Sequence, residues 1–223
     1  MYQGIILEGI SGSGKTEVLQ ALLQHPSLAT LSAASRLILT EHHTQRVLEL
    51  QEQQGTLQPE DHIALLEGLT AFIEGCATRT LDRGWHEHQL ASHDLFFLLE
   101  RFHLTHVFRF PHMQWEHVKE IDRRLKPLGT TLCLLTVDAE TLEKRLFSRQ
   151  DTCWLQYLKQ YGDTPAAIVD SFMKRQAEAR RLSQSSCLPV LEINTSEATA
   201  STVSQQIIST LCFPAVEKYS NGV

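Results

Sequence analysis

Eight consecutive residues near the start of the chain, GISGSGKT at 9–16, constrain its fold more than any other feature. They match the pattern G-x-x-x-x-G-K-[S/T], with an apolar stretch from Gln3 to Glu8 before them and a helical pattern from Thr16 to Gln24 after them. A strand that leads through a glycine-rich loop into a helix is the setting in which this pattern cradles the phosphates of a nucleoside triphosphate. The loop therefore predicts an NTP-binding α/β protein.

The loop residues have distinct expected roles. Gly12 lets the backbone turn tightly, so that successive N–H groups can point at phosphate oxygens. Lys15 is expected to reach the β- and γ-phosphates, and the hydroxyl of Thr16 to help hold Mg²⁺. The residues expected to contact the nucleotide are Gly9, Ser11, Gly12, Ser13, Gly14, Lys15 and Thr16.

Apolar and helical patterns alternate along the rest of the 223 residues. Further strands are predicted at 36–40, 95–99, 130–137 and 190–193, and helices at 41–54, 59–90, 114–125, 141–149, 165–182 and 197–211. Strands separated by helices indicate parallel pairing, which requires crossover connections. We therefore expect a three-layer P-loop NTPase fold, with a five-stranded parallel sheet and helices on both faces. It forms one domain over residues 1–213, followed by a poorly packed tail at 214–223.

The composition of the chain indicates which classes of partner to expect. The net charge of −6 argues against a protein that coats a nucleic acid polymer, whereas a small anionic ligand needs only a local basic pocket. No apolar run approaches the roughly 20 residues that span a bilayer, so no membrane partner is expected. Five cysteines, odd in number and without close pairs, suggest neither a disulfide framework nor a zinc site and fit a cytoplasmic setting.

The opening segment LEGISGSGKTEVL, with its Glu8-Gly9 pair, resembles the deoxynucleoside kinase and thymidylate kinase families. The resemblance implies a kinase that uses ATP and Mg²⁺ and phosphorylates a nucleoside or a nucleoside monophosphate. It also implies a helical acceptor-side region at 59–90 and a lid-like region at 145–162. An amphipathic segment in the middle of the chain could form a homodimer interface.

Glu41 follows the second predicted strand, at the sheet edge where the phosphate loop lies. A carboxylate there can orient an acceptor hydroxyl and take its proton, which is the role that the resemblance implies. Glu41 is followed by His42, where these kinases usually have proline. The alternative is a solvated glutamate at the start of a helix.

Glu100 and Arg101 follow the third predicted strand and resemble the acid–arginine pair of the same kinases. The acid can hold Mg²⁺ through water, and the arginine can clamp the oxygens of the acceptor. A salt-bridged strand end is the alternative use of this pair. Whether Glu41 or Glu100 acts as the base stays open at this point.

Arg145 and Arg149 lie four residues apart, which places them on one face of a predicted helix. Their position resembles the start of a kinase lid, where arginines offset charge on the transferring phosphoryl group. Two solvated arginines are the alternative. Asp138, just before this helix, is expected to cap it rather than to act as a Walker-B acid.

The histidines show no recognised metal-ligand spacing, whether at His86, His88 and His93 or at His42-His43. His103 and His106 follow Glu100-Arg101 at helical spacing and could line the acceptor pocket. Core packing is expected for most of the nearby aromatic residues, which are Phe102, Phe108, Phe110 and Trp115.

The leading hypothesis is an ATP-dependent phosphotransferase whose catalytic groups are Lys15, Glu41, Glu100, Arg101, Arg145 and Arg149, with Thr16 and Glu100 on the metal. A nucleotide-driven switch or regulatory ATPase is the second hypothesis, and it would need a residue that positions water. A module that binds nucleotide without turnover is the third.

Overall fold

A computed structural model of the protein describes residues 2–29, 33–81, 93–149 and 151–211. Its centre is a five-stranded sheet with the strand order β2-β3-β1-β4-β5, and every neighbouring pair is parallel. The strands are β1 (Tyr2–Glu8), β2 (Ala33–Leu39), β3 (His93–Glu100), β4 (Thr130–Thr136) and β5 (Val190–Asn194). The predicted fold class is confirmed.

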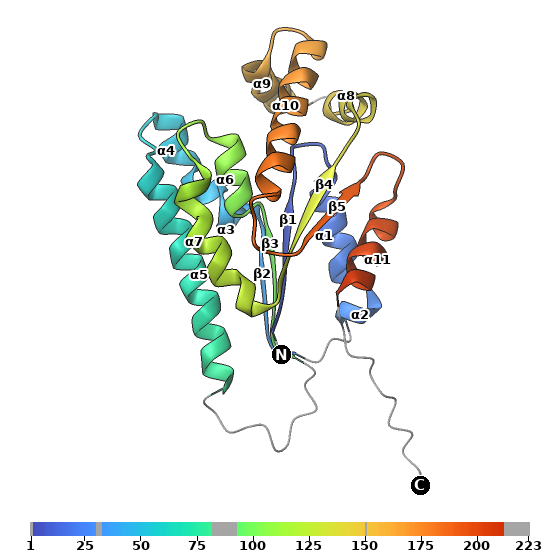
Figure 1. The fold of residues 1–223 in the computed structure, drawn as a ribbon. Helices are drawn as coiled ribbons and strands as arrows, with labels where there is room; N and C mark the ends of the chain where they lie inside the picture. The colour runs from blue at the N-terminus through green and yellow to red at the C-terminus, as the bar shows by residue number, and fades with distance from the viewer. Residues whose placement is uncertain (1, 30–32, 82–92, 150, 212–223) are drawn as a thin grey trace.

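Helices cover both faces of this sheet (Figure 1). One face carries α5 (Pro59–Leu81), α6 (His103–Arg109), α7 (Trp115–Leu125) and α10 (Pro165–Ser183), and the other carries α1 (Lys15–Gln24), α2 (Pro26–Ala29) and α11 (Ala200–Thr210). The shorter helices α3 (Glu41–Thr44), α4 (Glu49–Gln54), α8 (Ala139–Phe147) and α9 (Thr152–Leu158) follow strand ends or loops near the carboxyl edge. Single turns of 3₁₀ helix lie at η1 (Arg46–Leu48), η3 (Lys126–Leu128) and η4 (Lys159–Tyr161).

The alternation of side chains along β3 divides the core into two layers. Leu95, Phe97 and Leu99 pack toward α5, α6 and α7, while Phe96 and Leu98 pack toward α1 and α11. All five are buried, which is why the strand is a continuous apolar run. The parallel register with β1 pairs Leu7 with Glu100, so β3 ends where β1 leads into the phosphate loop.

Two helix predictions need correction. The segment 41–54 is broken into α3, η1 and α4, because Gln45 adopts a non-helical backbone with φ −148° and ψ −48°. Arg149 lies beyond the end of α8 at Phe147, so the expectation that it shares a helix face with Arg145 is wrong. The distal part of the 59–90 region, with His86 and His88, and the tail at 214–223 lie outside the described residues.

Among the described residues, no helix combines the length and the apolar character needed to cross a membrane.

Candidate active site

The phosphate loop joins β1 to α1, and glycine makes its shape possible. Gly12 and Gly14 have φ values of 84° and 83°, in the left-handed region that side chains disfavour. Gly14 is also the N-cap of α1, so the loop leads directly onto a helix N-terminus. The Nζ of Lys15 folds back over the loop and donates to the carbonyl oxygens of Gly9 at 2.8 Å and Ile10 at 2.7 Å.

Lys15 is buried, with charged groups of both signs around it. Burial and the nearby Arg101 together lower the pKa of its ammonium group to about 7, although Glu100, Glu41 and Glu8 act in the opposite direction. A bound phosphate would supply the negative charge that this ammonium group needs. The loop therefore has the backbone shape and the cation that a phosphate group requires.

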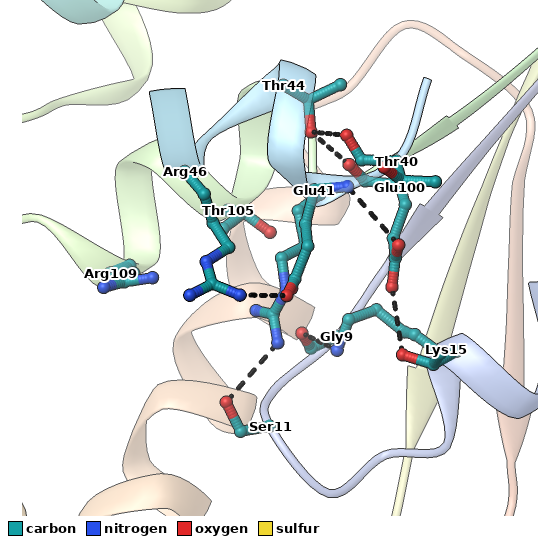
Figure 2. A network of polar contacts seen from close by, with 12 residues as sticks. Gly9, Ser11, Lys15, Thr40, Glu41, Thr44, Arg46, Glu100, Thr105 and Arg109 are labelled. Carbon is teal, nitrogen blue, oxygen red and sulfur yellow. Dashed lines mark hydrogen bonds and ion pairs between the residues drawn. The ribbon is translucent and has the colours of Figure 1, made fainter. Parts of the chain in front are cut away.

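Glu100 ends β3 and faces the loop. One carboxylate oxygen accepts from the Thr16 hydroxyl at 3.5 Å, and the other accepts from the backbone N–H of Glu41 at 3.4 Å. Figure 2 shows Glu100 and Glu41 side by side above Lys15. A hydroxyl and a carboxylate that meet in this way are the oxygen ligands that Mg²⁺ accepts. Within the described ranges no group of three or more histidine, cysteine or acidic side chains could hold a metal, so the ion's other ligands would have to be nucleotide oxygens and water.

Glu41 begins α3 and carries its carboxylate toward two arginines. Arg101 donates from Nε to Oε2 at 2.5 Å, and Nη1 of Arg46 lies 3.7 Å from Oε1. Burial opposes ionisation, but Arg101, Lys15 and Arg46 outweigh it and hold the pKa of the Glu41 carboxyl below its ordinary value. Glu41 is therefore ionised at neutral pH and can accept a hydrogen bond.

Arg101 links Glu41 to the phosphate loop. Its Nη2 donates to the hydroxyl of Ser11 at 3.4 Å while its Nε binds Glu41. The residue has a φ of 54°, which is uncommon for a side chain other than glycine. Strained backbone of this kind is concentrated at functional sites. The structure thus brings Glu41, Glu100 and Arg101 together beside the phosphate loop, and their catalytic roles stay predictions.

Glu8 has a role that the sequence did not indicate. Its buried carboxylate accepts from the backbone N–H groups of Phe102, Leu104 and Thr105 at 3.0, 3.1 and 3.3 Å, and from the Thr105 hydroxyl. These donors belong to the first turn of α6, a helix that the sequence analysis did not predict. An acid that ends a buried strand was the available signal. The Glu8 carboxylate therefore caps the N-terminus of α6, the helix that begins two residues after Arg101.

Arg145 and Arg149 are separated. The guanidinium of Arg145 donates to the carbonyl oxygen of Gly12 at 3.1 Å and to the hydroxyl and carbonyl of Thr195 at 2.9 and 2.6 Å. Arg149 is exposed and lies over the ring of Trp154 at 5.4 Å. Arg145 thus supports the phosphate loop, and the structure does not bring Arg149 to it.

Of the remaining candidate residues, the two histidines are buried and the side chain of Asp138 does not cap its helix. His103 and His106 are fully buried, so the expectation that they line an acceptor pocket is wrong. His106 contacts His62 at 2.7 Å, Nδ1 to Nδ1, and the Thr44 carbonyl at 2.8 Å. Asp138 is the N-cap of α8, but its side chain makes no capping bond and accepts from the amide of Asn194 at 2.9 Å.

The aromatic residues mostly pack in the core, as expected. Phe102 and Phe110 are buried there, and Trp115 packs against it. Phe108 also lines a narrow cavity beside the loop, with a volume of about 10 Å³. The residues around the cavity are Ile10, Ser11, Arg101, Phe108, Arg109, Tyr157, Phe172 and Arg175. Sequence analysis missed Arg109 and Arg175, which belong to no motif.

No protein-family model matches the chain, and no curated protein sequence is significantly similar to it. Solved structures are similar in fold. The YorR protein of Bacillus subtilis, in complex with phosphorylated GDP, is 15% identical, with a TM-score of 0.57 over 93% of this chain and 95% of that one. Shikimate kinase from Bacteroides thetaiotaomicron is also 15% identical, with a TM-score of 0.55 over 95% of this chain and 99% of that one.

Identities this low show the fold and nothing finer. They do not single out the deoxynucleoside and thymidylate kinase group that the opening segment resembles. What the sheet order, the phosphate loop and these likenesses show together is a P-loop NTPase fold, of the kind that small-molecule kinases have.

Proposed function

We propose that the protein is an ATP-dependent phosphotransferase that moves the γ-phosphoryl group to a small acceptor, for which we expect a nucleoside or a nucleoside monophosphate. The observation that carries this proposal is the chain of contacts from Glu41 through Arg101 to Ser11. These contacts join an ionised carboxylate to the phosphate loop (Figure 2). Phosphoryl transfer requires that the acceptor and the donor phosphates be held close together in this way.

The donor side consists of the loop amides, Lys15 and the first turn of α1. They bind the phosphates and offset the charge that spreads over the transferring group. Mg²⁺ would be held by Thr16 and, through water, by Glu100, and when bound it would offset charge on the phosphate oxygens. Arg145 keeps the loop in shape through its bond to Gly12.

On the acceptor side, Glu41 accepts a hydrogen bond from the acceptor hydroxyl and takes its proton as the new bond forms. The acceptor oxygen bonds to the γ-phosphorus, the bond from that phosphorus to the β–γ bridging oxygen breaks, and ADP leaves. Glu100 suits the base role less well, because it is buried and faces Thr16. We therefore assign the base to Glu41 and the metal side to Glu100.

The test is ADP release in the presence of Mg²⁺ and ATP, with nucleosides, nucleoside monophosphates and other small alcohols as acceptors. Glu41→Gln should keep its nucleotide affinity and lose roughly 10²-fold or more in transfer, since the amide cannot take the proton. Glu140→Gln is the matched control, because Glu140 pairs with Lys144 on an exposed helix. Equal ADP release without any acceptor, or full activity of Glu41→Gln, would contradict the proposal.

A further inference from the structure

We infer that the acceptor carries an anionic group of its own, a carboxylate or a phosphate, and that Arg101, Arg109 and Arg175 bind it in the cavity beside Ser11. This inference rests on the proposed function and names the chemical class of its acceptor. It narrows the expected acceptors to charged ones, such as a nucleoside monophosphate, and excludes neutral nucleosides.

The three arginines reach one cavity from three separate elements. Arg101 follows β3, Arg109 ends α6, and Arg175 lies in the middle of α10. Among the residues that the structure describes, no acidic side chain lines the cavity. Three like charges around one small space repel one another, and an anion placed among them relieves that repulsion.

The charges of the three arginines are not equally compensated. Arg101 binds Glu41, and Arg109 binds both carboxylate oxygens of Glu52 through Nη2 alone, at 3.0 and 3.1 Å. Arg175 has no carboxylate partner in the described part of the chain. Its guanidinium lies over the ring of Tyr161, 4.5 Å from the centroid. Stacking occupies the flat face of the guanidinium and leaves its N–H edge for an anion.

The cavity adjoins the proposed site for the donor phosphates, but it overlaps only the first half of the loop. Of the loop residues, Ile10 and Ser11 line it, whereas the second half of the loop, Gly12 to Thr16, does not. That second half leads into α1 and is supported by Arg145 on its other side. An anion bound among the three arginines would therefore belong to a second ligand, close enough to the loop to receive its phosphoryl group.

The shape of the groups suits the proposed ligand. A guanidinium presents paired N–H donors that match the oxygens of a carboxylate or a phosphate. The cavity of about 10 Å³ has room for little more than one water molecule. The arginine side chains must therefore swing outward to admit the anion, which long side chains can do without a shift of their helices.

The experiment measures anion binding by calorimetry while a non-hydrolysable ATP analogue with Mg²⁺ fills the donor site. Inorganic phosphate and acetate are the probes, and the one that binds more tightly distinguishes a phosphate-bearing acceptor from a carboxylate. We expect Arg175→Gln and Arg109→Gln to weaken binding of that probe at least tenfold, and Arg175→Lys to weaken it less. The matched control is Arg181→Gln, because Arg181 lies on the same helix but pairs with Glu178 on the surface.

The affinity for the ATP analogue should change less than twofold in all four variants, and their melting temperatures report whether they fold. The inference is overturned if neither anion binds the loaded protein, if the Arg109 and Arg175 variants bind the anion as the wild type does, or if they lose the analogue instead. Failure of the analogue to bind the wild type would overturn the proposed function as well. Normal analogue binding without anion binding would overturn only the class of acceptor.

Discussion

The two halves of the proposed site are built in different ways. The donor half is one stretch of eight residues, 9–16, whose shape depends on its own backbone and which Arg145 supports from outside. The acceptor half consists of Glu41, Arg101, Arg109 and Arg175, which come from three separate stretches of the chain, at 41, 101–109 and 175. A contiguous motif keeps its geometry through local backbone angles, whereas a distributed set keeps it only while the helices that carry it stay packed.

This difference has a consequence for mutations. A change in the donor half should act on nucleotide binding and leave the rest of the molecule intact. A change in the packing of the helices that carry the acceptor half should lower both the stability of the fold and the affinity for the acceptor. The following predictions separate the two halves.

The largest effect is expected for Lys15→Ala, which should lower phosphoryl transfer roughly 10³-fold. In the proposed site the ammonium group of Lys15 binds the phosphates, and no other lysine lies in the loop. The hydrogen bonds that its ammonium group donates all go to loop residues, so its removal should leave the rest of the fold intact. ADP release and thermal melting test this, with Lys119→Ala as the control, because Lys119 pairs with Glu116 on the surface of α7. Retained transfer, or loss of folding, would contradict the proposed independence of the donor half.

Glu8→Ala should lower the free energy of unfolding by about 3 kcal/mol. The reason is that three backbone N–H groups at the start of α6 would lose their acceptor. Glu8 adjoins the donor loop in the sequence, yet it supports the acceptor half, because α6 carries Arg109.

Urea unfolding measures the stability change, and Glu8→Gln, which keeps one acceptor oxygen, should lose less. In both variants, acceptor affinity should fall more than nucleotide affinity. An equal fall in the two affinities would argue that the halves are not separate.

Low pH should lower the free energy of unfolding through the buried His106, which lies in α6, the helix that carries Arg109. Burial lowers the pKa of His106 to about 3, whereas a histidine in the unfolded chain titrates near 6.5. As the pH falls below 6.5 the unfolded chain takes up the proton first, so this part of the stability is complete above pH 6.5 and is lost as the pH approaches 3. At pH 5 the loss is about 2 kcal/mol. His62, its partner, shifts in the same direction.

The measurement is urea unfolding at pH 7 and pH 5 for the wild type and for His106→Gln. The variant should show a smaller difference between the two pH values, although it is less stable at both. An unchanged difference would show that His106 does not titrate as its burial indicates.

The smallest predicted effect separates Arg145 from Arg149, for which the sequence predicted the same role. Arg145→Ala should weaken nucleotide binding about tenfold, which corresponds to about 1.4 kcal/mol, since the loop loses the support that Arg145 gives Gly12. Arg149→Ala should change it less than twofold, because Arg149 is exposed and stacks on Trp154. Calorimetric titration with the ATP analogue compares the two. Equal losses of affinity for the ATP analogue would show that Arg149 also acts at the phosphate loop.

Sequence analysis predicted most of the fold, because β3 and β4 contain the apolar runs LFFLL and LCLL and the glycine-rich loop stands between a strand and a helix. It also identified Glu41 and Glu100-Arg101, since residues that follow parallel strands gather at one edge of the sheet. It failed at α6, whose first turn depends on Glu8, a residue far away in the sequence. It failed for His103 and His106 because helical spacing gives the face of a helix but not what packs against it.

The sequence by itself determined the fold class, the phosphate loop and the acids at the strand ends, because backbone preferences and side-chain periodicity are local properties. Only the tertiary structure decided that Arg145 supports the loop, that Arg149 does not, and that Arg109 and Arg175 join Arg101 around one cavity. The physical reason is that the position of a long charged side chain depends on the packing of its helix and on the partners it meets there, and neither is written in the residues next to it.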